Sequence, residues 1–313
     1  MAEPRRLKQL AESINERARF PDQPHVIALS GGADSAALAG MLGRGPDAGT
    51  RCVHVHHGLA ASDLLAEAAQ AIADQLRLAI EIVRVEVEEG PSPEAMAREV
   101  RYPALAGSLA EGENMLLAHT RNDQAETVLL NLIRGAGIRG LSGMPYHRQP
   151  RMYRPFLDVT RDETREFASL CGLPFVDDPT NSDISIRRNR VRLELIPRME
   201  ELNPNIVATL ARTAEHLRQD SEYLDGVSQI PLLEDEESVF VATGVLLALD
   251  RPIRSRVIAG LVGSVRESDG ISSAELARVE EVLDDSSVAA ELEGGVSVNK
   301  RGPYLVVGTG NGQ

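Results

Sequence analysis

A short apolar run that ends at two glycines constrains this chain more than any other segment. The run Val26–Leu29 has the composition of a buried strand, and Asp34 and Ser35 open a stretch with helical character. Between them, Gly31 and Gly32 let the backbone turn tightly, so that its N–H groups can approach an oxyanion. The helix start adds unpaired N–H donors and the positive end of its dipole. This order of elements predicts a phosphate-binding loop.

The chain continues as alternating strands and helices. We expect strands at 25–30, 51–56, 80–87, 114–118 and near 151–155. We expect helices at 4–19, 34–43, 62–77, 93–110, 122–134 and 160–171. Such alternation favours an α/β fold, a doubly wound parallel sheet with helices on both faces. Ligands of these sheets bind at the carboxyl ends of the strands, near the point where strand order reverses.

Pro197, Asn203 and Pro204 interrupt the alternation and predict a domain boundary. We therefore expect one domain at 1–200 and a smaller helical or mixed domain at 201–313. The second domain is expected to contain helices at 205–227, 252–264 and 272–284, and two short strands around 296–298 and 304–307.

Composition limits the compartment and the partners. No apolar stretch approaches the roughly 20 residues that span a bilayer, and the first residues lack the apolar region of a signal peptide. The two cysteines, Cys52 and Cys171, form no CxxC motif. We therefore expect a cytoplasmic protein without a membrane partner.

The net charge of −14 argues against non-specific nucleic-acid binding, although residues 134–198 hold 12 arginines against 8 acids.

Two further segments lie at the carboxyl ends of predicted strands. His54 and His56 alternate along a strand and therefore point to one face, as structural histidines or as groups that border a ligand. Asp123 and Glu126 follow the strand at 114–118 and share the first turn of a helix. They either complement the helix dipole or hold an ammonium group and accept its proton.

Three more patterns have both a structural and a functional interpretation. Glu94 and Arg98 are spaced for a salt bridge within a helix, which precedes the acidic motif. The glycines of 135–143 form either a flexible connector or a loop that approaches a ligand. The four arginines of 187–192 suit phosphate or RNA contacts, or form a solvated basic face.

Together these segments resemble the motifs of the tRNA(Ile)-lysidine synthetase family of ATP pyrophosphatases. SGGADS is similar to the ATP motif, and no Gly-Lys-Ser/Thr ending of a kinase-type P-loop is present. Further similarity lies in VHVHHGL, EAMAREVRY, HTRNDQAET, IRGAGIRGLSGM and DDPTNSDISIRRNRVR. The resemblance covers roughly residues 25–200 and implies an adenine nucleotide α-hydrolase-like sheet.

The resemblance implies a ligase reaction. ATP would adenylate the C2 carbonyl oxygen of the wobble cytidine in a tRNA(Ile) with a CAU anticodon, and the ε-amine of free L-lysine would then attack C2 and expel AMP. Two other functions stay open: sulfur transfer by a tRNA thiolase, which usually needs reactive cysteines, and nucleotide binding without catalysis. A homodimer also stays open.

The resemblance further implies roles for single residues. Asp34 would coordinate Mg²⁺, Asp123 and Glu126 would bind lysine, and Arg98 and His119 would stabilise negative charge. ATP would be bound by Ser30, Gly31, Gly32, Ala33, Asp34, Ser35, His54 and His56. Contacts to tRNA or phosphate would come from Arg187, Arg188, Asn189, Arg190 and Arg192, and the C-terminal domain would also contact the tRNA.

Overall fold

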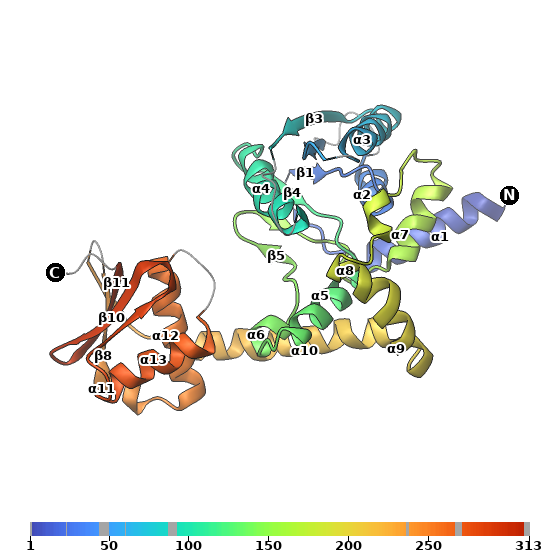
Figure 1. Ribbon diagram of the computed structural model, residues 1–313. Coiled ribbons are helices and arrows are strands. Elements are labelled where there is room, and N and C mark those ends of the chain that lie inside the picture. Colours follow the sequence, from blue (N-terminus) through green and yellow to red (C-terminus); the bar gives the residue numbers. More distant parts are fainter. Residues whose placement is uncertain are drawn as a thin grey trace. The chain divides into compact units, whose positions relative to one another are not determined.

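The computed structural model describes residues 2–22, 24–43, 50–59, 61–86, 93–235, 238–266 and 271–309. The chain forms two compact units, Met1–Arg218 and Gln219–Gln313 (Figure 1). The sequence predicted a domain boundary after residue 200, whereas the units divide after Arg218, within helix α10 (Ile206–Val227).

A six-stranded sheet forms the centre of the first unit, in the order β3-β2-β1-β4-β6-β5. Its strands are β1 (His25–Ala28), β2 (Arg51–His56), β3 (Ala79–Arg84), β4 (Asn114–Leu116), β5 (His147–Arg148) and β6 (Met152–Tyr153). Neighbouring strands pair in parallel, except β5 with β6. Because β1 pairs with β2 on one side and β4 on the other, the strand order reverses beside β1. The order confirms the doubly wound sheet and puts its switch point beside the predicted phosphate loop.

The helices of this unit confirm the long predicted helices to within a few residues. They are α1 (Ala2–Arg17), α2 (Ala33–Leu42), α3 (Ser62–Leu76), α4 (Pro93–Gly107), α5 (Arg121–Ile133), α6 (Ile138–Leu141), α7 (Arg161–Leu170), α8 (Arg187–Arg190) and α9 (Ile196–Leu202). Two irregular turns accompany them, η1 (Pro179–Ser182) and the π-helical η2 (Val191–Leu195). The sequence did not predict α6, α8, α9, η1 or η2, because such short elements show little hydrophobic periodicity.

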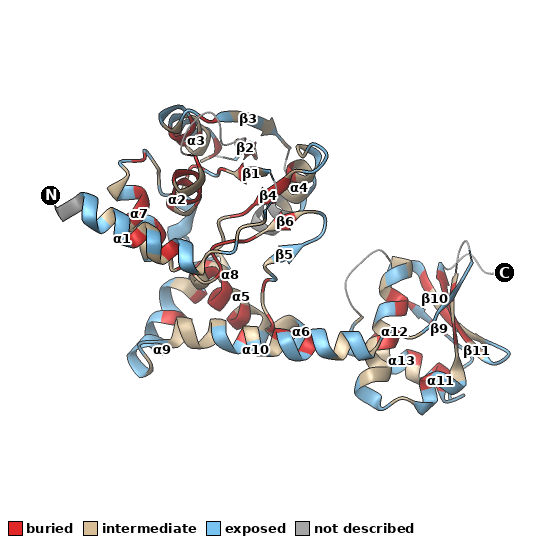
Figure 2. Ribbon diagram, turned by 180° about the vertical axis from the view of Figure 1, so that it is seen from behind, coloured by how far each residue is buried: buried red, intermediate tan, exposed pale blue. Residues whose placement is uncertain are grey.

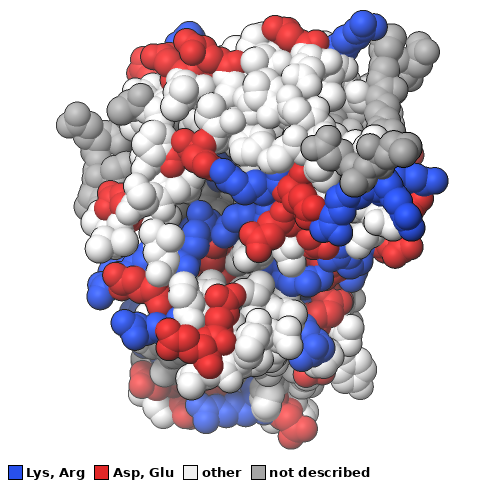
Figure 3. Space-filling view, turned by 90° about the vertical axis from the view of Figure 1, so that its right-hand side faces the viewer, with Lys and Arg blue, Asp and Glu red and all other residues white. Residues whose placement is uncertain are grey.

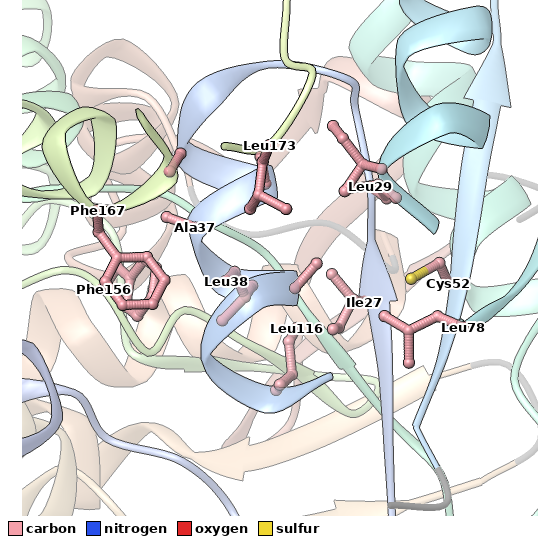
Figure 4. Packing of buried hydrophobic residues seen from close by; sticks show 14 of the residues in the cluster. Ile27, Leu29, Ala37, Leu38, Cys52, Leu78, Leu116, Phe156, Phe167 and Leu173 are labelled. Atoms are coloured by element: carbon pink, nitrogen blue, oxygen red, sulfur yellow. The ribbon is translucent and has the colours of Figure 1, made fainter. Parts of the chain in front are cut away.

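Alternate strand residues face two layers of helices. Ile27 and Cys52 pack in one cluster with residues of α2, α3 and α7, part of which Figure 4 shows around Leu38. Val26 and Val53 pack on the other side of the sheet with residues of α4. Helix α2 is buried from Ser35 to Gly40 and appears red in Figure 2. The helix behind the phosphate loop is therefore held on all sides by the core.

The second unit contains a five-stranded antiparallel sheet in the order β7-β8-β11-β10-β9. Its elements are β7 (Leu233–Glu234), β8 (Ser238–Ala242), α11 (Thr243–Ala248), α12 (Arg251–Arg266), α13 (Ser273–Leu283), β9 (Ala289–Leu292), η3 (Glu293–Gly295), β10 (Val296–Arg301) and β11 (Tyr304–Thr309). Val298 and Leu305 pack with Ile258 and Val279 in a separate core.

The sequence predicted α12, α13, β10 and β11 but missed the other strands of this sheet. One reason is that β9 begins with two alanines, which have low strand propensity. Across the residues that the structure describes, no helix has the length and apolar character needed to cross a bilayer.

Candidate active site

A cavity of about 570 Å³ lies at the carboxyl ends of β1, β2 and β4. Most of its polar lining comes from five segments, namely Ser30–Ser35, His54–His57, His119–Asp123, Arg161–Arg165 and Asp177–Arg192, and Ser62 and Arg101 add to it. The parallel sheet thus gathers motifs that are far apart in the sequence, at the edge where its topology predicts a ligand. Figure 3 shows basic side chains gathered across the middle of one face of the molecule, with acidic side chains interspersed among them.

The loop after β1 is shaped by its own backbone and hydroxyl groups. Gly31 has a φ of +86°, and a Cβ there would lie 2.3 Å from the carbonyl oxygen of Leu65. Ser35 Oγ donates to the Gly32 carbonyl at 3.0 Å and accepts from the Ser30 N–H at 3.1 Å. Gly32 caps α2 without a side-chain hydrogen bond. The first N–H groups of the helix therefore remain available to an anion.

Asp34 projects from the first turn of α2 into the cavity. The Thr164 hydroxyl donates to its Oδ1, and Arg161 Nε lies 3.9 Å from its Oδ2. Burial raises the pKa of Asp34 to about 6, and the charge of Asp123 adds to this rise. A half-buried carboxylate whose ionisation is disfavoured is stabilised by a bound cation. Mg²⁺ is commonly held by one or two carboxylates together with phosphate oxygens, so this donor set fits it.

Asp123 has both a structural and an electrostatic role. Its Oδ2 accepts from the backbone N–H and the hydroxyl of Thr120, both at 2.8 Å, at the start of α5. Its Oδ1 accepts from Arg161 at 2.9 Å and Arg188 at 3.0 Å. Burial favours a higher pKa, but these arginines outweigh burial and hold the pKa of Asp123 well below its usual range. Asp123 is therefore an anion that lines the cavity.

Glu126 has no exposed area and lies within a group of three arginines. It accepts from Arg161 Nη2 at 3.1 Å, Arg188 Nε at 2.8 Å and Arg192 Nε at 2.7 Å. We call these three arginines with Asp123 and Glu126 the arginine–carboxylate cluster. Its members come from α5, α7, α8 and η2, so the cluster ties three separate parts of the chain together.

The predicted tRNA-contact segment divides into two sets. Arg188 and Arg192 turn inward to the cluster, and the Asn189 amide donates to the carbonyls of Thr180 and Asp183. Arg187 and Arg190 are exposed, and Arg190 pairs with Glu194 on the surface at 3.1 Å. Only these last two present their side chains outward from the segment 187–192.

Three histidines line the cavity. They are His54, His57 and His119. His54 Nδ1–H donates to the Leu29 carbonyl at 2.8 Å. Burial, with Arg101 nearby, lowers the pKa of His57 to about 4, and burial holds the pKa of His119 well below its ordinary value. These imidazoles are therefore neutral at pH 7.

His56 shares a strand face with His54 but does not line the cavity among the described residues. Its Nε2–H donates to Asp63 at 2.9 Å, and the Gly58 N–H donates to its Nδ1 at 3.2 Å. Alternation alone could not separate the two histidines, because His56 is held by Asp63 of α3 and by the Gly58 N–H after β2, contacts that the strand pattern does not encode.

Sequence reasoning missed Arg161, Thr164 and Arg165, which line the cavity or touch Asp34. The available signal was their position in the first turns of the helix after the fifth predicted strand.

The side chains of Glu94 and Arg98 lie outside the described part of α4, so the role predicted for Arg98 stays a prediction. Arg101, on the same helix, lines the cavity.

The comparisons with known proteins agree with this geometry. Residues 2–199 match a family described as the PP-loop domain. The chain is 39% identical to a tRNA(Ile)-lysidine synthase of Streptomyces coelicolor, over 96% of this chain and 90% of that protein. It is 40% identical to the enzyme of that name from Pseudomonas fluorescens, over 66% of this chain. The chain spans about half the length of this relative, 49%.

A solved structure shares the fold over about two thirds of this chain. The U34-tRNA thiolase NcsA from Methanococcus maripaludis, which was solved with its [4Fe-4S] cluster, superposes with a TM-score of 0.56. It is 18% identical in sequence, over 67% of this chain and 78% of that chain. On the family match and the relative from Streptomyces coelicolor, the chain belongs to the tRNA(Ile)-lysidine synthase family of PP-loop proteins.

Proposed function

We propose that this protein is a tRNA(Ile)-lysidine synthetase, a ligase that joins free L-lysine to C2 of the wobble cytidine in a CAU anticodon. ATP activates the cytidine, and AMP and pyrophosphate are released. The observation that carries the proposal is the single cavity that joins the phosphate loop, Asp34 and the arginine–carboxylate cluster. Family membership supports it. Because ATP, lysine and tRNA meet in the cytoplasm, we place the protein there.

In the first step, the C2 carbonyl oxygen of cytidine attacks the α-phosphate of ATP, and the bond to the β-phosphate breaks. The loop Ser30–Ser35 holds the departing pyrophosphate through the N–H groups at the start of α2. Arg161 and Arg192, which line the cavity, stabilise the charge that develops on the phosphates. Asp34 would hold Mg²⁺, which when bound neutralises phosphate charge.

In the second step, the lysine ε-amine attacks C2 and AMP leaves. An ammonium group is not nucleophilic, so it must first lose a proton. Asp123 and Glu126 bind this group, and one of them accepts the proton and passes it on to water, because arginines hold the pKa of Asp123 too low for it to keep the proton. Glu126 has no exposed area, whereas Asp123 lines the cavity, so the lysine ammonium would contact Asp123 first. His119, and Arg98 on α4, stabilise the negative charge of the leaving AMP.

For tRNA binding we propose the exposed Arg187 and Arg190 together with the second unit. Arg192 contacts phosphate within the cavity. Arg188 and Asn189 would support the outer surface from within, or approach phosphate after a rearrangement of the cluster. Light scattering with and without tRNA tests the homodimer that the sequence leaves open.

The test is incubation of the purified protein with ATP, labelled lysine and a tRNA(Ile) transcript that carries a CAU anticodon. We expect label in the tRNA, dependent on ATP, and equal amounts of AMP and lysidine by mass spectrometry. A tRNA(Met) with the same anticodon is the control and should remain unlabelled. ATP binding without any lysine transfer would contradict the proposal.

Sulfur transfer is a weaker alternative. The chain has two cysteines, and the described structure shows Cys52 buried with its pKa raised by burial to about 12. A thiol with that pKa is neither a ready nucleophile nor a ready metal ligand. An iron–sulfur cluster generally needs three or four cysteine ligands, more than this chain holds.

A further inference from the structure

The glycine-rich segment 135–143, between α5 and β5, is anchored by hydrogen bonds to α5. Met144 N–H donates to Gln124 Oε1 at 2.7 Å, and Gln124 Nε2 donates to the Met144 carbonyl at 3.0 Å. Gly143 has a φ of +67°, and a Cβ there would lie 2.6 Å from Gln124 Oε1. Upstream, the Asn131 amide donates to the Gly140 carbonyl at 2.7 Å. The glycines therefore allow close packing on α5.

Arg218 holds the same segment from its other side. Its Nη2 donates to the carbonyls of Ser142, at 2.9 Å, and Met144, at 3.0 Å. Its guanidinium carbon lies 5.1 Å from the centre of the Tyr146 ring. Arg218 is only 9% exposed, and Glu215 is its carboxylate partner on α10. The Met144 carbonyl thus accepts from both Gln124 and Arg218.

Gln124 lies between the two acids of the arginine–carboxylate cluster in the first turns of α5. It is buried, as are Asp123 and Glu126. Gln124, Met144 and Arg218 do not line the cavity among the described residues, so they act on it only through other groups. We infer that Arg218 is a positioning residue. By holding Met144 on Gln124, it fixes the first turn of α5 and the direction of the Asp123 and Glu126 carboxylates.

Under the proposed function, this positioning affects lysine more than ATP. The phosphate loop is supported by α2 and by Val176, whose N–H donates to the Gly31 carbonyl at 3.0 Å. Neither support involves Arg218 in the described structure. We expect Arg218→Gln to raise KM for lysine about tenfold, since small misplacements of binding groups have effects of this size or larger. KM for ATP should stay within about twofold of its normal value.

Arg218→Lys should partly rescue the lysine KM, because an ammonium can still donate to one of the two carbonyls. Arg212→Gln is the matched control, since Arg212 is exposed on the same helix, and it should change neither KM. An equal rise of both KM values in Arg218→Gln would show a general structural effect and overturn the inference.

Hydrogen exchange tests the inference independently of lysidine formation. In Arg218→Gln we expect faster amide exchange both at 142–146 and at 120–126, with no change in Arg212→Gln. Faster exchange confined to 142–146, or no change at all, would mean that Arg218 does not position α5. If the normal protein forms no lysidine, the proposed function fails, and the exchange data alone decide on Arg218.

Discussion

At the residue scale, the site is built from charged side chains that are buried or half-buried. Asp34 lies near the end of the phosphate loop, in the first turn of α2, next to Thr164 and Arg161, and burial is the main reason that its pKa is raised to about 6. A carboxylate with a raised pKa lowers the stability of the ligand-free protein at neutral pH, because it must ionise in surroundings that disfavour its charge. Binding sites commonly reduce stability in this way.

Asp34→Asn is therefore expected to abolish pyrophosphate release while increasing stability. The pKa of Asp34 rises from 3.8 in the unfolded chain to about 6 in the folded protein, so the folded form binds its proton more tightly. Normal protein should lose about 3 kcal/mol of stability as pH rises between about 4 and 6. The variant should lack this loss. Urea unfolding at several pH values, without Mg²⁺, measures it, and equal slopes for both proteins would contradict the assignment.

Glu126→Gln should destabilise the protein strongly, by about 3–5 kcal/mol, because it removes a fully buried negative charge that pairs with three half-buried arginines. The matched control is Glu194→Gln, which breaks only the surface pair with Arg190. That change should cost less than about 1 kcal/mol. Chemical denaturation of the two variants gives both values, and similar costs would argue against a tightly packed cluster.

At the element scale, the phosphate loop depends on the support behind it. Helix α2 is buried over most of its length, and the carbonyl of Leu65 on α3 leaves no room for a side chain at residue 31. The loop is thus a rigid connection between β1 and α2. Its glycines serve close packing as well as approach to phosphate.

Gly31→Ala is expected to eliminate measurable ATP binding, because relief of the contact with Leu65 must displace the loop. Gly58→Ala is the control, since Gly58 also has a positive φ, +70°, but a Cβ added there would meet no described atom within 4 Å. The control should lose about 1–2 kcal/mol of stability and keep ATP affinity. Calorimetry of ATP binding compares them, and equal affinity in the two variants would refute the steric argument.

At the scale of the whole molecule, two separate cores support the two units. The cluster around Ile27 and Leu38 belongs to the first unit, and that around Ile258 and Val298 belongs to the second. Neither cluster contains described residues of the other unit.

Ile258→Ala is accordingly expected to destabilise the second unit by about 2–5 kcal/mol, the usual cost of such a truncation in a core. ATP affinity of the first unit should not change. Calorimetric unfolding should show one transition shifted to lower temperature and the other in place. A parallel shift of both transitions would show that the units unfold together.

The sequence by itself determined the doubly wound sheet, the phosphate loop and the family, because strand and helix periodicity and contiguous motifs are local properties. Only the tertiary structure decided which charges meet. Arg188 and Arg192 read as a surface for phosphate or RNA, yet they bind Glu126, and the sequence offered no sign that Arg161 joins them. Arg188 and Glu126 are 62 residues apart. Whether an arginine faces solvent or a buried acid depends on how distant helices pack, which no short window of sequence encodes.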